Sequence, residues 1–387
     1  MRRIRKIVAF FLAALFCCLL TGCQSQSKQL ESLALAILFG VDTDAEGAIE
    51  LTVQIPKIGA SSGMDADSGD EAQQSQASDY MIASAKGATY SDAMDLLRLT
   101  IPRDLSLRQV KMIIISEELA SSDTFIEITQ SIAETYQLYN AAEMIICMGS
   151  ARDFIEEQKP IIGTRISTGV IAMLEHYQER GFIPTTSFAD FLYSCVSVYS
   201  DSLAALAAQS EPGAEALPEG GVGDSLPSEI PAQSENRNEY MGCAVFRDGI
   251  MVDKLNGHET LFVNLLRGKN PPMNYTVDGD VAQLQFNSSP KIQIDVSRDS
   301  VEISIRVDMT AVALTVMPDI ERLRSQFEQD MLSTFRHCQA LGVDPFGFAE
   351  IAAGKFLTID QWLEYDWHEK FPQAEFSLDI RIHKSDT

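Results

Sequence analysis

The sequence predicts a mixed α/β protein of more than one domain, with a helix-covered sheet in the amino-terminal half and an antiparallel sheet packed by a long helix in the carboxyl-terminal half. Three observations support this prediction. Apolar runs typical of buried strands alternate with helical periods before residue 200, an acidic proline-rich stretch follows, and apolar residues of strict period two come after it. At 387 residues, the chain is long enough for two or three domains.

Composition and charge exclude several classes of protein. Hydrophobic residues make up 45% of the chain and charged residues 22%, which is typical of globular proteins and argues against disorder and against a polytopic membrane protein. The formal net charge of -25 argues against nucleic acid as a partner, because phosphates repel a polyanion and no basic stripe is present. Anionic headgroups repel such a chain too, so its membrane attachment has to be covalent or through another protein.

Residues 1–22 have the three parts of an export signal. A basic run over 1–6 precedes an apolar run over 7–20, and small residues stand before Cys23. The apolar run is shorter than the about 20 residues that a transmembrane helix needs. The segment resembles the bacterial lipobox, which here consists of Leu20, Thr21, Gly22 and Cys23. We therefore expect cleavage before Cys23 and a lipid on its sulfur; ordinary secretory cleavage is the alternative.

The amino-terminal domain is predicted over residues 23–200. The apolar stretches 34–41 and 49–55 flank turn-forming residues, including Asp42 and Asp44, and so predict a hairpin with turn chemistry in place of a calcium loop. Residues 61–79 contain almost no apolar side chains, which predicts a disordered acidic insert.

Helices and buried strands alternate in the rest of this domain. Ser91 can cap a helix that runs through Leu99, and the apolar run 112–115 predicts a strand buried on both faces. The next helix has apolar residues at three- and four-residue spacing, namely Phe125, Ile128, Ile132 and Tyr136. Residues 143–148 predict the following strand. These elements together predict a sheet covered by helices.

Residues 201–239 are predicted to be an acidic linker, because prolines, glycines and carboxylates dominate 209–239. The carboxyl-terminal domain, residues 240–387, is one unit or two subdomains. Its predicted elements are paired strands at 241–246 and 249–255, a helix at 260–266, strands at 292–296 and 301–309, a helix at 319–341 that ends at Gly342, and a strand at 376–382 in the same sheet.

No catalytic or metal-binding motif is found. The five histidines are His176, His258, His337, His368 and His383. None of them has the i, i+4 spacing of a zinc hydrolase, so surface or helix-end roles are favoured. A nucleophile elbow and phosphate-binding loops are absent from the sequence as well. We therefore expect no enzyme activity, no metal and no cofactor.

Cysteines and tryptophans are interpreted as core residues. Four cysteines remain after the leader is removed and Cys23 is lipidated, namely Cys147, Cys195, Cys243 and Cys338. They are too far apart for a zinc or redox pair, and their apolar neighbours favour burial, although export permits disulfides. Trp362, Tyr365 and Trp367 could line a ligand slot, but their spacing favours a role in attaching a terminal helix to the sheet.

The ordered set of motifs resembles the GerAC-type, or Ger(x)C, family of lipoprotein C subunits of nutrient germinant receptors. Beyond the lipobox, the segments that carry the resemblance are Gly40–Asp44, Leu51–Ile55, Gly87–Ala93, Lys111–Ala120, Ala244–Gly249, Leu255–Thr260, Asp344–Ala349 and Trp367–Pro372. They span nearly the whole mature chain. Gln24 and Ser25 depart from the Trp-Asp that commonly follows the lipidated cysteine in this family.

The resemblance implies a non-catalytic, multidomain α/β protein. It implies a location on the outer face of the spore inner membrane, beside GerA-type and polytopic GerB-type subunits, and a role in triggering germination. The germinant and the interface residues are not implied. Two alternatives remain from the residues alone: a solute-binding lipoprotein of a transporter, which needs two similar lobes, and an anchored extracytoplasmic hydrolase, which needs a converged catalytic set.

Overall fold

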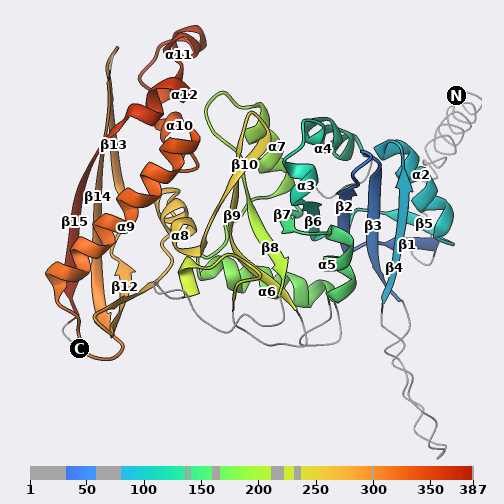
Figure 1. Cartoon of the computed structure of the whole chain (residues 1–387), viewed down its shortest axis with the longest axis horizontal. Helices are drawn as coiled ribbons and strands as arrows, with labels where there is room; N and C mark the ends of the chain where they lie inside the picture. The colour runs from blue at the N-terminus through green and yellow to red at the C-terminus, as the bar shows by residue number, and fades with distance from the viewer. Residues whose placement is uncertain are drawn as a thin grey trace, which may run out of the picture.

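The computed structural model describes residues 32–57, 80–135, 138, 141–158, 166–210, 222–230, 237–298 and 300–385. These residues form an eight-stranded sheet, a five-stranded sheet and a small two-stranded sheet. Figure 1 shows the amino-terminal strands, in blue, at one end of the molecule and the carboxyl-terminal sheet, in orange and red, at the other. None of the described helices is long and apolar enough to cross a membrane.

The eight-stranded sheet has the order β10-β9-β8-β7-β6-β2-β3-β4. Its strands are β2 Leu38–Thr43, β3 Ile49–Pro56, β4 Tyr80–Gly87, β6 Met112–Ser116, β7 Glu143–Met148, β8 Leu203–Gln209, β9 Asn238–Arg247 and β10 Ile250–Leu255. The four central strands are parallel, and an antiparallel pair flanks them on each side. The predicted hairpin is confirmed as the antiparallel pair of β2 and β3.

Helices cover both faces of this sheet. They are α2 Tyr90–Thr100, α3 Glu117–Ala120, α4 Phe125–Glu134, α5 Ala151–Glu157, α6 Ile166–Glu179 and α7 Phe188–Val196. Ile113 and Ile115 of β6 face the core beneath α2, α3, α4 and α7, whereas Met112 and Ile114 face the core beneath α5 and α6. The continuous apolar run predicted a strand buried on both faces, and this alternation confirms it.

The cap of α2 differs from the prediction. Thr89, two residues before the predicted Ser91, is the N-cap, and its side chain accepts a hydrogen bond from the Asp92 amide at 3.1 Å. Thr89 has the extended backbone that an N-cap requires, whereas Ser91 already lies within the helix.

The sheet also extends across the predicted linker. Residues 203–209 form β8 inside the sheet, and β9 and β10, which were predicted to belong to the carboxyl-terminal domain, complete it. Compositional bias predicted the linker, but β8 consists largely of alanines, and all of its residues except Gln209 are buried. The sequence bias lies mainly in 211–221 and 231–236, which, like the predicted insert at 61–79, fall outside the described residues.

The five-stranded sheet contains β11 Met273–Val277, β12 Asp280–Phe286, β13 Lys291–Val296, β14 Val301–Ala313 and β15 Glu375–Lys384. β12 and β13 pair with different parts of the same edge of β14, and β15 pairs with its other edge. The sheet is antiparallel except for β15, which runs parallel to β14 because several helices separate the two strands in the chain. The predicted closing strand therefore does lie in this sheet.

Helix α9, Ile320–Leu341, covers this sheet within the bounds that the sequence predicted. Asp319 caps its start by accepting from the Arg322 amide at 2.9 Å, and Gly342 ends it with a φ of 68°. Such a left-handed backbone favours glycine at the end of a helix. The remaining elements of this half are α8 Gly257–Leu266, α10 Phe348–Ala353, α11 Ile359–Tyr365 and α12 Trp367–Lys370.

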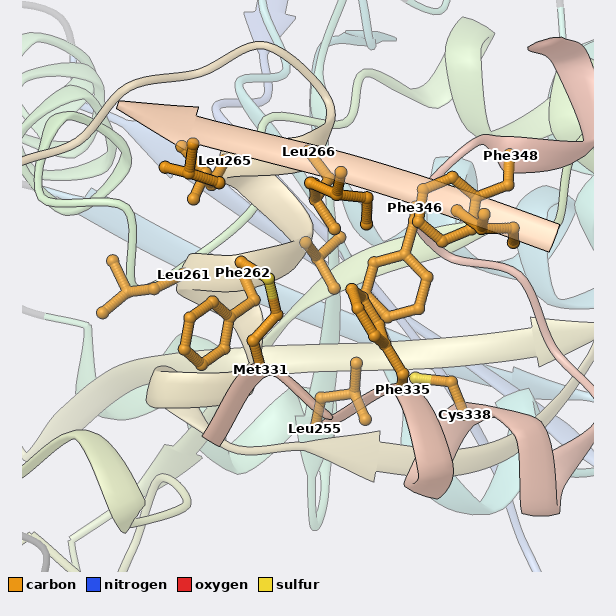
Figure 2. Packing of buried hydrophobic residues seen from close by; sticks show 14 of the residues in the cluster. Leu255, Leu261, Phe262, Leu265, Leu266, Met331, Phe335, Cys338, Phe346 and Phe348 are labelled. Carbon is orange, nitrogen blue, oxygen red and sulfur yellow. The ribbon is translucent and has the colours of Figure 1, made fainter. Parts of the chain in front are cut away.

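One hydrophobic core joins the two large sheets. Leu203, Val245 and Leu255 of the eight-stranded sheet belong to the same buried cluster as the apolar faces of α8 and α9. Figure 2 shows this packing, with Leu255 close to Met331 and Phe335 of α9. The two halves of the chain therefore share buried apolar surface.

Candidate functional site

The predicted lipidation site lies outside the described residues. Leu20, Thr21, Gly22 and Cys23 all precede residue 32, where the described chain begins. The chain then enters β1, Leu33–Leu35, which pairs in parallel with β5, Asp104–Ser106. The end of the molecule that carries β1 is therefore where the predicted tether leads into the fold.

A cavity of about 600 Å³ lies at this end. Its walls are mainly apolar and come from β1, β3, β4, the turn after α2, and α6. Lys57, Arg103 and Lys111 also line it, and none of its described lining residues is acidic. No pattern in the sequence predicted this cavity, because its lining residues come from six separate segments.

The Gly40–Asp44 motif positions helix α5. The Asp42 carboxylate accepts hydrogen bonds from the amides of Ala151 at 2.7 Å and Arg152 at 2.9 Å, at the positive end of α5. Burial nevertheless raises the pKa of Asp42 to about 6. A Cβ at Gly40 would lie 2.6 Å from the Ile155 side chain, so this glycine lets α5 approach the sheet. The motif therefore has a structural role.

Asp44 supports the turn between β2 and β3. Its carboxylate accepts from the amides of Glu46 at 3.0 Å and Ala48 at 2.8 Å, and it pairs with Lys86. The turn chemistry predicted for this segment is confirmed.

The Asp344–Ala349 motif closes the junction between the sheets. Asp344 is buried and accepts from the amides of Phe346, Phe348 and Ala349, the shortest distance being 2.6 Å to Ala349. The Asp344 amide donates to Asp201 at 2.6 Å, and the Arg267 guanidinium donates to the Pro345 carbonyl at 2.6 Å.

Burial shifts all three charged groups of this junction toward their neutral forms. It raises the pKa of Asp344 to about 6, raises the pKa of Asp201 and lowers the pKa of Arg267. Sequence reasoning missed Asp201 and Arg267, because neither has a distinctive spacing. Asp201, Arg267 and Asp344 link three segments of the chain. These are the connection from α7 to β8, the end of α8, and the connection from α9 to α10.

Four histidines lie beside carboxylates, namely His258, His337, His368 and His383. His337 lies 2.7 Å from Glu259 and 3.4 Å from Asp253, and the hydrogen bond to Glu259 is the main reason that the pKa of His337 rises to about 9. At neutral pH, His337 is therefore a cation and not a general base. His258 lies 3.3 Å from Asp224 and 2.9 Å from the Tyr275 hydroxyl.

Burial raises the pKa of each of the four described cysteines, which disfavours their thiolate forms. All four cysteines predicted for the folded chain are free, and three of them are buried. Burial raises the pKa of Cys243 to about 12 and raises those of Cys147 and Cys338 as well. No set of three metal-ligating side chains converges among the described residues.

The aromatic cluster near the carboxyl terminus is part of the core. Trp362 and Trp367 are buried and stack at 5.8 Å between ring centroids. The Trp362 indole donates to the Val198 carbonyl at 2.7 Å, which attaches α11 to the segment before β8. The ligand-slot interpretation of these tryptophans therefore receives no support from their positions.

Fold and motifs together define a multidomain α/β protein in which the polar motif residues hold helices and sheets in place. Comparison with known proteins then identifies the family. The family model described as "Spore germination protein N-terminal domain" matches residues 26–205, and the one described as "Spore germination B3/ GerAC like, C-terminal" matches residues 241–386. The chain therefore belongs to the GerAC family of spore germination proteins.

Similar proteins agree with this assignment. "Putative spore germination protein YfkR" of Bacillus subtilis (strain 168) is 22% identical over 394 residues, covering 96% of this chain and 94% of that protein. The crystal structure of the GerBC protein matches with a TM-score of 0.50 at 14% identity, covering 90% of this chain and 97% of that chain. The latter is a likeness of fold, and it extends over both large sheets.

Proposed function

We propose that this protein is the lipid-anchored C subunit of a spore nutrient germinant receptor, and that it acts by contacting membrane-embedded A and B subunits. The observation that carries this proposal is the match of both GerAC family models, which together span most of the chain. The lipobox at Leu20–Cys23 supports the anchor. The proposed location is the outer face of the spore inner membrane.

The anchor explains how an acidic protein stays at a membrane. A single acyl chain gives only marginal binding, whereas the two chains of a diacylglyceryl group give stable anchoring. The polar residues 24–29 then act as a short tether. Confinement to a surface raises the effective concentration of the protein near integral partners, so weak contacts are sufficient for assembly.

A non-catalytic role is supported by the chemistry of the described polar groups. His337 is held as a cation, the buried thiols have raised pKa values, and Asp42 and Asp344 cap backbone amides. His337, Asp42 and Asp344 each have a structural partner. The alternative of a solute-binding lipoprotein gains no comparable support. Such a protein needs two similar lobes, whereas the two large sheets differ in strand number and order.

The anchor is tested by Cys23→Ala. We expect the variant to fold, to leave the membrane fraction and to reduce the germination response to nutrients, because the protein loses its confinement. Cys195→Ala is the matched control, since it removes a half-buried thiol from the folded domain without touching the lipobox. Fractionation, mass spectrometry of residue 23 and nutrient-triggered loss of spore refractility are the measurements. A normal nutrient response from Cys23→Ala spores would contradict the proposal.

A further inference from the structure

The cavity beside β1 has walls suited to a hydrocarbon chain. Leu33 and Leu35 of β1, Ile55 of β3, Met81 of β4, Ile101 after α2 and Ile171 of α6 contribute to them. Its volume of about 600 Å³ lies within the range of roughly 300–1,000 Å³ that is typical of ligand sites. An apolar ligand gains free energy by leaving water for such walls.

The charges that line this cavity have one sign. Lys57 and Arg103 are exposed there beside Lys111, in a chain with 55 acidic and 30 basic residues. Many other described cations pair with carboxylates, as Lys254 does with Glu117. Neither Lys57 nor Arg103 forms an ion pair with a described residue. These two exposed cations therefore have no carboxylate partner among the described residues.

A second cavity, of about 640 Å³, provides a comparison within the same sheet. Its lining includes Arg152, which pairs with Glu50 at 2.8 Å and with Glu156 at 2.9 Å. Its lining lysine, Lys86, pairs with Asp44. Cations in that second cavity are neutralised by carboxylates of the protein, whereas Lys57 and Arg103 beside β1 can take an anion from a ligand.

The length of chain before β1 limits how far the cavity can lie from the membrane surface. Leu33, which lines the cavity, is ten positions after Cys23, and ten extended residues span at most about 35 Å. If Cys23 carries the lipid, as the proposed function requires, the cavity stays within this distance of the bilayer surface. Membrane lipid is then present at high effective concentration.

We propose that the cavity beside β1 binds an acyl chain of an anionic membrane lipid, with its hydrocarbon along the apolar walls and its headgroup at Lys57, Arg103 and Lys111. Such binding orients the eight-stranded sheet relative to the membrane, which attachment at Cys23 alone does not. The membrane location of the ligand rests on the proposed function, but the binding chemistry of the cavity does not.

Photo-crosslinking of the lipidated full-length mature protein tests this proposal. The protein is returned to phosphatidylcholine vesicles that contain a trace of phosphatidylglycerol with a photoreactive acyl chain. We expect label on peptides that contain Ile55, Met81 or Ile101. The same photoreactive chain on phosphatidylcholine should label these peptides several-fold less, because its headgroup has no net charge.

Four variants test separately how the lining cations and the shape of the cavity contribute to lipid labelling. The double variant Lys57→Glu, Arg103→Glu should reduce phosphatidylglycerol labelling to the phosphatidylcholine level, whereas Lys291→Glu, an exposed lysine on β13, should leave it unchanged. Met81→Trp should fill the cavity and remove label from both lipids, and Met81→Leu should retain it. Thermal unfolding of each variant shows whether the fold is intact; a loss of label in Lys291→Glu or Met81→Leu would contradict the assignment.

The Cys23→Ala chain separates this proposal from the proposed function. Incubated in solution with a short-chain photoreactive phosphatidylglycerol, it should still be labelled at the same peptides. A lipidated protein that sediments with vesicles but is not labelled at these peptides would overturn the cavity proposal and leave the anchor intact. Label that appears only in Cys23→Ala would mean that the lipid of Cys23 itself fills the cavity, and displacement of label by an amino acid or sugar would assign a polar nutrient; either result overturns the proposal.

Discussion

Individual polar residues in this protein act mainly by holding backbone and helices together. Asp42 and Asp344 direct their carboxylates at helix-end amides, and Glu259 serves two partners at once. One oxygen of Glu259 accepts from the Asn256 amide at 3.0 Å, and the other lies 2.7 Å from His337. A residue on α8 is thereby linked electrostatically to a residue on α9.

The raised pKa of His337 predicts that the free energy of unfolding depends on pH. Its pKa rises from 6.5 to about 9 on folding, so its stabilising contribution is complete below pH 6.5 and is lost as the pH rises through about 9. The difference in free energy of unfolding between wild type and His337→Gln should therefore shrink between pH 7 and pH 10. This window lies above the pKa values of about 6 of Asp42 and Asp344.

Urea unfolding at several pH values measures this difference. His383→Gln is the control, because His383 is largely exposed on β15 and lies away from Glu259 and Asp253. A difference between wild type and His337→Gln that stays constant up to pH 10 would show that the charge of His337 is not stabilised by its two carboxylates.

At the scale of elements, capping residues set the ends of several helices. Asn256 and Glu259 form a reciprocal capping box at the start of α8, and Gly342 ends α9 in the left-handed conformation. These ends have structural consequences, because α8 lies between the two large sheets and its first turn supplies Glu259 to His337.

Asn256→Ala should destabilise the protein by about 1 kcal/mol, because the Glu259 amide loses its side-chain acceptor, which lies at 2.9 Å. Asn256→Ser should retain most of the stability, since its hydroxyl can accept the same hydrogen bond. Midpoints of urea denaturation measure both variants. Equal midpoints for Asn256→Ala and wild type would indicate that water replaces the cap without cost.

At the scale of the whole molecule, one hydrophobic core connects the eight-stranded sheet to the carboxyl-terminal half. The eight-stranded sheet contributes Leu203, Val245 and Leu255 to the cluster beneath α8 and α9. Trp362 extends this junction through its hydrogen bond to the Val198 carbonyl. We therefore expect the two sheets to unfold together.

Phe154→Ala tests this coupling. Phe154 is fully buried against the eight-stranded sheet, so its truncation should cost about 3–5 kcal/mol. Both tryptophans of the chain lie in the other half, so their fluorescence reports on that half. Fluorescence and circular dichroism should show the same lowered midpoint.

A fluorescence midpoint that stays at the wild-type value while the circular dichroism midpoint falls would indicate independent units. Leu357→Ala is the control, because Leu357 is 92% exposed and its truncation should leave both midpoints unchanged.

The sequence by itself determined several elements of the fold. Period and capping predicted α9 and its end at Gly342, the apolar run predicted β6 as a strand buried on both faces, and the ordered motifs indicated the GerAC family. The lipobox at Cys23 remains a prediction from sequence. These features are readable because hydrophobic period and cap chemistry are local properties of the chain.

Only the tertiary structure decided how distant segments meet. It placed β8, β9 and β10 in the amino-terminal sheet across the predicted linker, and it brought Asp201 to Asp344. It also assembled Lys57, Arg103 and Lys111 around an apolar cavity. Strand pairing, burial of charge and cavity shape depend on residues far apart in the sequence, and the free energy of each contact depends on what surrounds it after folding.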